Sequence, residues 1–403
     1  MNSTTQEIET INIIIIILPN REEIITINIS DNILQKITDY YKFDYIDLYY
    51  EGTFIEYGLS PLDCGMTPSS RITVDNVGRI KTRQQVIDFI KELCDINEII
   101  FNEEFDKNDF NNCYNCYNCY DYIINQTFHK STIKILPYSV GRLDIQTNLE
   151  FFNNQLISLP KNFCRIKIGG NLYLFNNQLK SLPESFSKIT LGGSLNLSNN
   201  QISSLPESFG LIKIRGTLNL CDNKLNELPE SFVNLKVGCH LDLSGNQLKS
   251  LPESFCKIEI GCNLDLSTNQ LKSLPESFSK ITLGGSLNLS NNQISSLPES
   301  FSEFTLEGDL NLSYNKIESL PESFSKIKLF DLNLSYNKIE SLPESFSKIK
   351  LLGILNLSNN KIESLPESFV GLNIHINIHI NTHINTTGNL NLSEEDNDEY
   401  EDY

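Results

Sequence analysis

The stretch LNLSYNKIESLPESFSKI, residues 332–349, decides the fold, and nearly the same letters begin 22 residues earlier at Leu310. Leu-Pro pairs mark this repeat along the chain, and their prolines are 23 residues apart except for one interval of 22. A fixed period of this length predicts a solenoid, in which stacked units bury a core that no single unit could bury alone. The prolines are Pro137, Pro160, Pro183, Pro206, Pro229, Pro252, Pro275, Pro298, Pro321, Pro343 and Pro366.

Each unit reads L-x-L-x-x-N-x-[LI]-x-x-L-P-x-[SN]-F. The L-x-L segment alternates like a short parallel strand, so both leucines are expected to face inward. The phenylalanines are expected to fill the convex side, and each LPES segment to start a short helical turn with proline at its first position. The asparagine after the strand is expected to form a ladder, because a buried amide can satisfy turn backbone of its own and adjacent units. Its members are Asn154, Asn177, Asn200, Asn223, Asn246, Asn269, Asn292, Asn315, Asn337 and Asn360.

This motif resembles the leucine-rich repeat family, specifically its intracellular 23-residue class with LPxxF, which includes Ras-pathway scaffold proteins. The chain is also similar to repeat proteins of A+T-rich genomes, such as those of large DNA viruses of amoebae. The resemblance covers Leu136 to Phe369. It implies an α/β solenoid with a curved parallel sheet and short helical turns on the convex side.

The N-terminal region does not carry the repeat. Residues 1–10 are expected to be disordered, and residues 11–77 to form a small α+β domain. The segments INIIIIIL and IITINI predict two strands, SDNILQKITDYY a helix, and YIDLYYEG and SRITVDNV further strands. This order resembles ubiquitin-like β-grasp domains. No Gly-Gly tail follows Val74, so conjugation to targets is not expected.

The remaining boundaries come from the residues that flank the array. Residues 78–132 are expected to form a helical linker and N-terminal cap, because Val86, Phe89, Ile90 and Leu93 share one face of a predicted helix. The array should cover residues 133–393, with a strand restarting at Leu390 after an insertion of about 12 residues. The acidic residues 394–403 should be a solvated, disordered tail.

Charge and composition exclude several classes of protein. Lys and Arg number 32 against 51 Asp and Glu, so the net charge is −19, which disfavours nucleic acid and anionic membranes as partners. The apolar run 11–18 lacks the basic flank of a signal peptide, and no run approaches a membrane span of about 20 residues. We therefore expect a cytoplasmic protein with free thiols, or one in the host cytoplasm if it is viral.

Two tracts raise the question of metal binding. Cys113, Cys116 and Cys119 have C-x2-C spacing, with His129 as a candidate fourth ligand, and His375, His379 and His383 lie four residues apart. Both tracts are low-complexity repeats, and slippage explains them without a metal. The histidine tract then predicts an edge strand. No metal and no cofactor are expected.

The chain also lacks the motifs of common enzymes. It has no phosphate-binding loop, no G-x-S-x-G and no H-E-x-x-H, so no catalysis is expected. A thiol enzyme that uses Cys94 or Cys64 is the alternative from a different class.

The predicted function is non-catalytic protein binding on the concave face, through aromatic anchors. The middle units offer only Ser and Asn at the predicted outward positions, such as Ser198 and Asn199. Two aromatic groups stand out, with lysines beside the second that would complement an acidic partner, and drift of surface positions is an equal alternative. The candidate residues are Phe152, Tyr173, Phe175, Tyr314, Tyr336, Lys316, Lys338, Lys361, Asp309 and Asp331.

Other functional readings remain open. The chain could be an adaptor in the ubiquitin system, docked through its N-terminal domain, or a regulator of a small GTPase. The sequence identifies neither the partner nor the oligomeric state.

Overall fold

The computed structural model describes residues 88–97, 132–304, 306–366 and 368, and the backbone of residues 83–87 and of strand residues within 10–75 and at 378–379. The described residues fall into two compact units. The first comprises those within 1–127, 135–146 and 159–167, and the second those within 128–134, 147–158 and 168–403.

A five-stranded sheet forms in the N-terminal region, in the order β2-β1-β5-β3-β4. Its strands are β1 (Thr10–Ile17), β2 (Arg21–Asn28), β3 (Asp47–Tyr50), β4 (Thr53–Phe54) and β5 (Arg71–Asp75). β1 pairs antiparallel with β2 and parallel with β5. The segment predicted to be a helix, SDNILQKITDYY, lies outside the described residues, so the β-grasp domain stays a prediction.

Helix α2 (Arg83–Ile96) follows in the first unit. Its residues Phe89, Ile90 and Leu93 are buried, as expected for the apolar face of an amphipathic helix. Asn97 follows the last residue of the helix, and its side chain forms two hydrogen bonds to the backbone of Ile135. Its Nδ2 donates to the Ile135 carbonyl at 2.8 Å, and its Oδ1 accepts from the Ile135 N–H at 3.0 Å. The rest of the predicted linker, residues 98–131, lies outside the described part of the chain. Among the described residues, no helix has the length and apolar character that crossing a bilayer requires.

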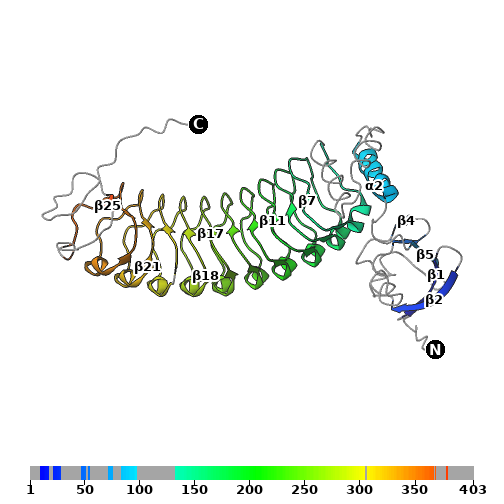
Figure 1. Ribbon diagram of the computed structural model, residues 1–403. Helices are drawn as coiled ribbons and strands as arrows, with labels where there is room; N and C mark the ends of the chain where they lie inside the picture. Colours follow the sequence, from blue (N-terminus) through cyan, green and yellow to red (C-terminus); the bar gives the residue numbers. More distant parts are fainter. Residues whose placement is uncertain are drawn as a thin grey trace, which may run out of the picture. The chain divides into compact units, whose positions relative to one another are not determined.

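The second unit is built around an eleven-stranded parallel sheet. Equivalent leucines pair from unit to unit, for example Leu195 with Leu218 and Leu287 with Leu310. Figure 1 shows these strands along the inner side of a curved array. They are β7 (Leu149–Glu150), β9 (Leu172–Tyr173), β11 (Leu195–Asn196), β13 (Leu218–Asn219), β15 (Leu241–Asp242), β17 (Leu264–Asp265), β19 (Leu287–Asn288), β20 (Leu310–Asn311), β22 (Leu332–Asn333), β24 (Leu355–Asn356) and β25 (Ile378–His379).

Short 3-10 helices line the outer side of the second unit (Figure 1), and two more, η1 and η2, belong to the first unit. The proline of each Leu-Pro pair stands one position before the helix in extended backbone, with φ −65° and ψ 148° at Pro183, rather than at the first helical position as predicted. The helices are η1 (Tyr138–Arg142), η2 (Lys161–Arg165), η3 (Glu184–Lys188), η4 (Glu207–Leu211), η5 (Glu230–Asn234), η6 (Glu253–Lys257), η7 (Glu276–Lys280), η8 (Glu299–Glu303), η9 (Glu322–Lys326) and η10 (Glu344–Lys348).

Two-residue strands return the chain from the helices to the inner side. Six of them form a four-stranded sheet, β12-β14-β16-β18, and a pair, β21-β23. The returning strands are β6 (Asp144–Ile145), β8 (Lys167–Ile168), β10 (Thr190–Leu191), β12 (Lys213–Ile214), β14 (Lys236–Val237), β16 (Glu259–Ile260), β18 (Thr282–Leu283), β21 (Lys328–Leu329) and β23 (Lys350–Leu351).

Stacked phenylalanines fill the core between the strands and the 3-10 helices. Rings of successive units lie nearly parallel, with centroids 6.4 Å apart for Phe186 and Phe209 and 6.1 Å apart for Phe324 and Phe346. These side chains are fully buried. The offset stacking adds to the area that each ring removes from water.

The asparagine that follows each strand joins neighbouring units by hydrogen bonds. The Oδ1 atom of Asn269 accepts from the Leu248 N–H at 3.0 Å, in the preceding unit. Its Nδ2 atom donates to the Leu243 carbonyl of that unit at 3.0 Å, and to the carbonyls of Leu266 and Ser267 at 3.1 Å each. One buried amide therefore satisfies backbone groups on two units.

The strand after β24 departs from the sequence prediction. β25 pairs with β24 in register, Leu355 with Ile378 and Asn356 with His379, so it begins one 23-residue period after Leu355. The histidine tract thus contains the edge strand predicted for it, one period after Leu355 and without an insertion before it, whereas the segment at Leu390 lies outside the described residues. The Ile-His tract provides the next strand at the right spacing, which the Leu-x-Leu pattern alone does not reveal.

Candidate binding surface

Three rows of side chains run across the strands on the inner side of the array. The leading row holds the residue before the first leucine of each strand, the central row the residue between its two leucines, and the turn row the residue before the ladder asparagine. The leading row comprises Asn148, Asn171, Ser194, Thr217, His240, Asn263, Ser286, Asp309, Asp331 and Ile354. The central row comprises Glu150, Tyr173, Asn196, Asn219, Asp242, Asp265, Asn288, Asn311, Asn333 and Asn356. The turn row comprises Asn153, Asn176, Asn199, Asp222, Gly245, Thr268, Asn291, Tyr314, Tyr336 and Asn359.

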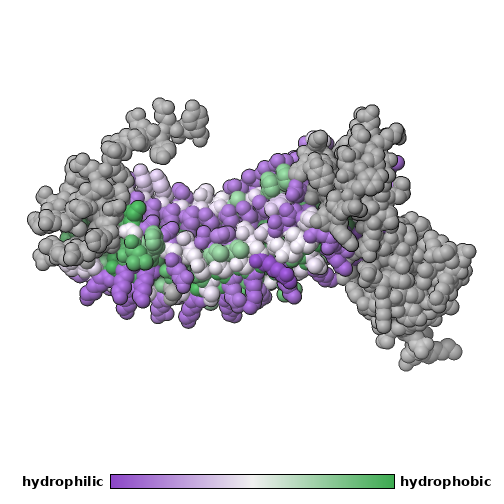
Figure 2. Space-filling view, viewed as in Figure 1, coloured by the Kyte–Doolittle hydropathy of each residue, from purple (hydrophilic) through white to green (hydrophobic). Residues whose placement is uncertain are grey.

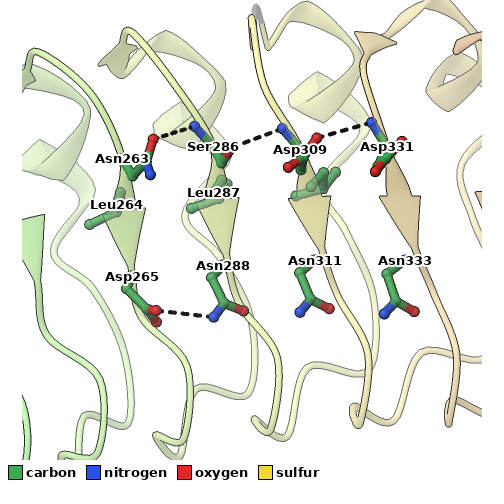
Figure 3. Close-up of a pocket in the computed structure, with 11 residues that line it drawn as sticks. Asn263, Leu264, Asp265, Ser286, Leu287, Asn288, Asp309, Asn311, Asp331 and Asn333 are labelled. Atoms are coloured by element: carbon green, nitrogen blue, oxygen red, sulfur yellow. Dashed lines mark hydrogen bonds between the residues drawn. The ribbon is translucent and has the colours of Figure 1, made fainter. Parts of the chain in front are cut away.

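The leading row forms a chain of hydrogen bonds from unit to unit (Figure 3). The Asn263 Oδ1 atom accepts from the Ser286 N–H at 2.9 Å, and the Ser286 Oγ atom from the Asp309 N–H at 3.0 Å. Asp309 Oδ1 then accepts from the Asp331 N–H at 3.3 Å, and Asp331 Oδ1 from the Ile354 N–H at 2.6 Å. Each carboxylate is thereby held in place by the backbone of the next unit.

A hollow of about 360 Å³ lies over the strands β17, β19, β20 and β22. It is lined by the strand residues Leu264, Leu287 and Leu310, whose side chains are buried in the core, and by the carboxylates of Asp265, Asp309 and Asp331, which stand among amides and a serine hydroxyl (Figure 3). The Oδ2 atom of Asp265 accepts from Asn288 Nδ2 at 3.0 Å. The side chains that surround the hollow are therefore polar.

Charge is separated on the array. Residues 132–366 contain 22 Lys and Arg and 22 Asp and Glu, so this part of the chain is neutral although the whole chain carries −19. The three rows nevertheless hold no Lys or Arg and only one histidine. They hold six acids, which are Glu150, Asp222, Asp242, Asp265, Asp309 and Asp331.

Tyr314 and Tyr336 form a stacked pair in the turn row of the same units that carry Asp309 and Asp331. Their ring centroids are 4.2 Å apart with planes 8° from parallel, and the residues are 48% and 46% exposed. Burial first, and then the neighbouring Tyr336 hydroxyl, raise the pKa of Tyr314. The pair presents an aromatic surface to solvent.

The backbone at the turn row is left-handed in every unit between Asn153 and Asn359. Tyr314 and Tyr336 each have a φ of 54°. Asparagine, aspartate and glycine accept this conformation most readily, and they occupy most of the row. A tyrosine at such a position costs on the order of 1 kcal/mol or more of backbone strain.

The second aromatic group lies nearer the start of the array. Phe152 and Phe175 stack with centroids 4.7 Å apart, and Tyr173 meets Phe175 edge-on at 6.2 Å. All three are half-buried, in contrast to Tyr314 and Tyr336. The Tyr173 hydroxyl accepts from Asn171 Nδ2 at 2.9 Å. This group is a second, less exposed aromatic patch on the strand side.

The candidate lysines and the candidate aspartates, which were placed in one group from the sequence, do not lie together in the structure. Lys316, Lys338 and Lys361 follow the ladder asparagine and lie outside the three rows, at the opposite end of the strands from Asp309 and Asp331. The Lys361 ammonium pairs with Glu340 at 3.6 Å, with both side chains well exposed.

The leucine-rich repeat family model matches residues 194–212, 239–258, 286–304, 328–349 and 352–372. These segments contain the strands, turns and ladder asparagines described above. The array is a leucine-rich repeat solenoid.

Solved leucine-rich repeat structures resemble the chain. A leucine-rich repeat protein of Leptospira interrogans is 23% identical, with 64% of this chain and 80% of that chain covered and a TM-score of 0.38. The leucine-rich effector protein YopM of Yersinia pestis is 28% identical, with 58% of each chain covered and a TM-score of 0.39. A chain in the structure of the Drosophila Toll–Spatzle complex is 21% identical, with 62% of this chain and 46% of that chain covered and a TM-score of 0.36. No curated protein gave a match.

Some of the repeat positions that were predicted from the sequence to face solvent are buried. Ser198 is buried, and its Oγ atom donates to Asn196 Oδ1 at 2.8 Å, whereas Asn199 in the turn row is exposed. The residue after the second leucine therefore packs against its own unit.

An exposed apolar patch at the C-terminal repeats was missed by sequence reasoning. Phe330, Leu352 and Ile354 are 50%, 79% and 40% exposed. Hydrophobic atoms gather toward this end of the array in Figure 2. The available signal was the residue missing near Phe330, together with Leu352 where most other repeats have glycine.

Cys221 lies between acidic residues on the inner side. Burial first, and then Asp242 and Asp222, raise the pKa of its thiol to about 12. Burial, and then Asp95, also raise the pKa of Cys94. Neither thiol is set up to ionise at neutral pH, as a nucleophile must.

The predicted metal tracts lie almost entirely outside the described residues. Cys113, Cys116, Cys119, His375 and His383 are not described, and His379 is described only as backbone in β25. Within the described part of the chain, no group of three or more His, Cys, Asp or Glu could hold a metal ion.

Proposed function

We propose that the chain is a non-catalytic scaffold that binds a protein partner on the inner side of its leucine-rich repeats. The observation that carries this proposal is the exposed stack of Tyr314 and Tyr336. Two tyrosines are kept at left-handed positions where most other repeats have asparagine or another residue suited to that backbone. The packing of the repeats does not require tyrosine at these strained positions. The two tyrosines therefore point to a role in binding rather than in folding.

Tyrosines suit this role because of their shape and chemistry. Each offers a large contact area with few rotatable bonds and a hydroxyl at its tip, and tyrosine is enriched among residues that dominate binding energy. The hollow over β17, β19, β20 and β22 adds a concave surface with fixed polar groups on the same side of the array. A rigid, preformed surface lowers the entropy that binding costs.

The chemistry of the described cysteines argues against the thiol-enzyme alternative. Cys94 is buried and its pKa is raised, so its thiolate is scarce at neutral pH. Cys64 lies outside the described residues. Roles in the ubiquitin system or with a small GTPase would rest on the N-terminal region, and no described side chain favours either.

The test is an affinity titration against a partner recovered by proximity labelling in the native cell. Tyr314→Asn with Tyr336→Asn removes the stack but introduces the residue that five other repeats use there. We expect the dissociation constant to rise at least about 30-fold, which corresponds to about 2 kcal/mol.

A second double variant tests whether the other aromatic group, which contains Phe152 and Phe175, binds the partner instead. Phe152→Ser with Phe175→Ser introduces the serine that most repeats carry at this position. We expect a change of less than about threefold in the dissociation constant. If the phenylalanine variant loses binding while the tyrosine variant keeps it, the proposed anchor is wrong.

A further inference from the structure

We propose that the inner surface around β17–β22 accepts an extended, arginine-containing segment of a partner protein. This inference rests on the proposed function, because it gives the chemistry of the partner that the scaffold binds. It also reverses the expectation, drawn from the lysines, of an acidic partner.

The first support is the distribution of charge. Residues 132–366 are neutral as a whole, yet the leading, central and turn rows contain acids and no Lys or Arg. Within the described residues, Asp242, Asp265, Asp309 and Asp331 have no ion-pair partner. A concave face of one sign, with its counter-charges kept elsewhere, attracts and orients a partner of the opposite sign.

The second support is the way the carboxylates are held. Asp309 and Asp331 each use Oδ1 to accept a backbone N–H of the next unit. Within the described structure, no hydrogen bond uses their Oδ2 atoms. The side chains are therefore fixed while one oxygen of each can accept from a ligand, and pre-oriented carboxylates suit the paired donors of a guanidinium group.

The third support is the aromatic stack at the other end of the same strands. Asp309 and Tyr314 lie at the two ends of one strand and its turn, as do Asp331 and Tyr336; they are five residues apart, which is at most roughly 16 Å. An extended segment of similar length can place one cation at the carboxylates and another over a tyrosine ring. Arginine stacks on aromatic rings better than lysine does.

The lysines of the array do not compete with this assignment. Lys316, Lys338 and Lys361 stand outside the rows, and a column of glutamates, Glu318, Glu340 and Glu363, follows them two residues later. The Lys361–Glu340 pair shows that these columns meet. They present mixed charge rather than a basic surface.

The experiment titrates the full chain with three labelled nine-residue peptides, in which arginine, lysine or glutamate alternates with glycine. At a salt concentration of about 150 mM, long-range attraction to the net charge is largely screened. We expect saturable binding of the arginine peptide, several-fold weaker binding of the lysine peptide and none of the glutamate peptide.

Two triple variants with the same net charge distinguish an effect of the inner surface on peptide binding from an effect of the net charge of the chain. Asp265→Asn, Asp309→Asn and Asp331→Asn together keep an acceptor at each position, and asparagine already occupies neighbouring positions in both rows. Glu253→Gln, Glu276→Gln and Glu299→Gln remove the same charge from exposed residues of η6, η7 and η8. We expect at least about tenfold weaker arginine-peptide binding for the first variant and less than about twofold for the second.

Equal losses in the two variants would overturn the proposal, as would tighter binding of the glutamate peptide or no saturable binding up to about 1 mM peptide. The recovered partner distinguishes this failure from failure of the proposed function. If the tyrosine variant weakens partner binding and the aspartate variant does not, the scaffold function stands and the cationic segment is excluded.

Discussion

At the scale of single residues, the turn row shows where the fold and a binding role make different demands. The turn requires only a residue that tolerates a positive φ, and asparagine occupies this position as Asn153, Asn199 and Asn291. Tyr314 and Tyr336 depart from it together and stack on each other. The stacking energy of about 0.5–1.5 kcal/mol offsets much of the backbone strain.

This balance predicts that the tyrosines can be replaced at little cost to the fold. Tyr314→Asn with Tyr336→Asn should change the free energy of unfolding by no more than about 1 kcal/mol, because lost stacking and relieved strain cancel. Urea unfolding of the full chain measures it. A loss of several kcal/mol would show that the pair is part of the core.

The reactivity of the Cys221 thiol depends on the acidic residues around it. Its pKa of about 12 leaves very little thiolate at pH 8, so alkylation of the native protein should be slow and should speed up about tenfold per pH unit. Asp242→Asn removes a carboxylate that raises this pKa and should accelerate alkylation. Mass spectrometry of the Cys221 peptide gives the rates, and an unchanged rate in the variant would mean that Asp242 does not act on the thiol.

At the scale of one repeat, the strand, the ladder asparagine and the 3-10 helix act together. The strand contributes two buried leucines, and the asparagine joins the turn to the preceding unit. The 3-10 helix places its phenylalanine in the stacked core. Each unit thus completes the hydrogen bonds of its neighbour, as a solenoid requires.

The ladder asparagine and a nearby serine provide a matched comparison. Asn269→Ala should lower the free energy of unfolding by about 1–3 kcal/mol, because it leaves backbone groups of two units without partners. Ser267→Ala should cost less than about 0.5 kcal/mol, because within the described structure no hydrogen bond uses its Oγ. Urea melts of the full chain compare them, and equal losses would show that the amide bonds do not hold the units together.

The repeat pattern predicts the strands, the ladder and the outer helical turns because each rests on contacts that recur at a fixed spacing. It mispredicts Ser198, since burial there depends on a hydrogen bond to Asn196 that alternation does not encode. It predicts an edge strand in the histidine tract, where β25 lies, but does not place that strand as the next repeat, because isoleucine replaces the expected leucine. The separation of Asp309 from Lys316 is visible only once the strand and its turn are placed in space.

At the scale of the whole molecule, net charge is a poor guide to the binding surface. The excess of acid lies outside residues 132–366, and within them the charges balance but are unevenly placed. Figure 2 shows hydrophilic residues along the edge where the 3-10 helices lie, whereas the acids of the three rows face the inner side. The two sides of one array therefore offer different chemistry to a partner.

The central claim is that the partner sits on the inner side, and site-specific crosslinking tests it most directly. A photo-crosslinking amino acid is placed at Asn311, which lines the hollow, or at Lys326, exposed on η9 in the neighbouring outer region. Each protein is irradiated with the recovered partner, and the crosslinked product is identified by mass spectrometry. A crosslink from position 311 and none from 326 is the predicted result. A crosslink from position 326 alone would place the partner on the outer side and contradict the claim.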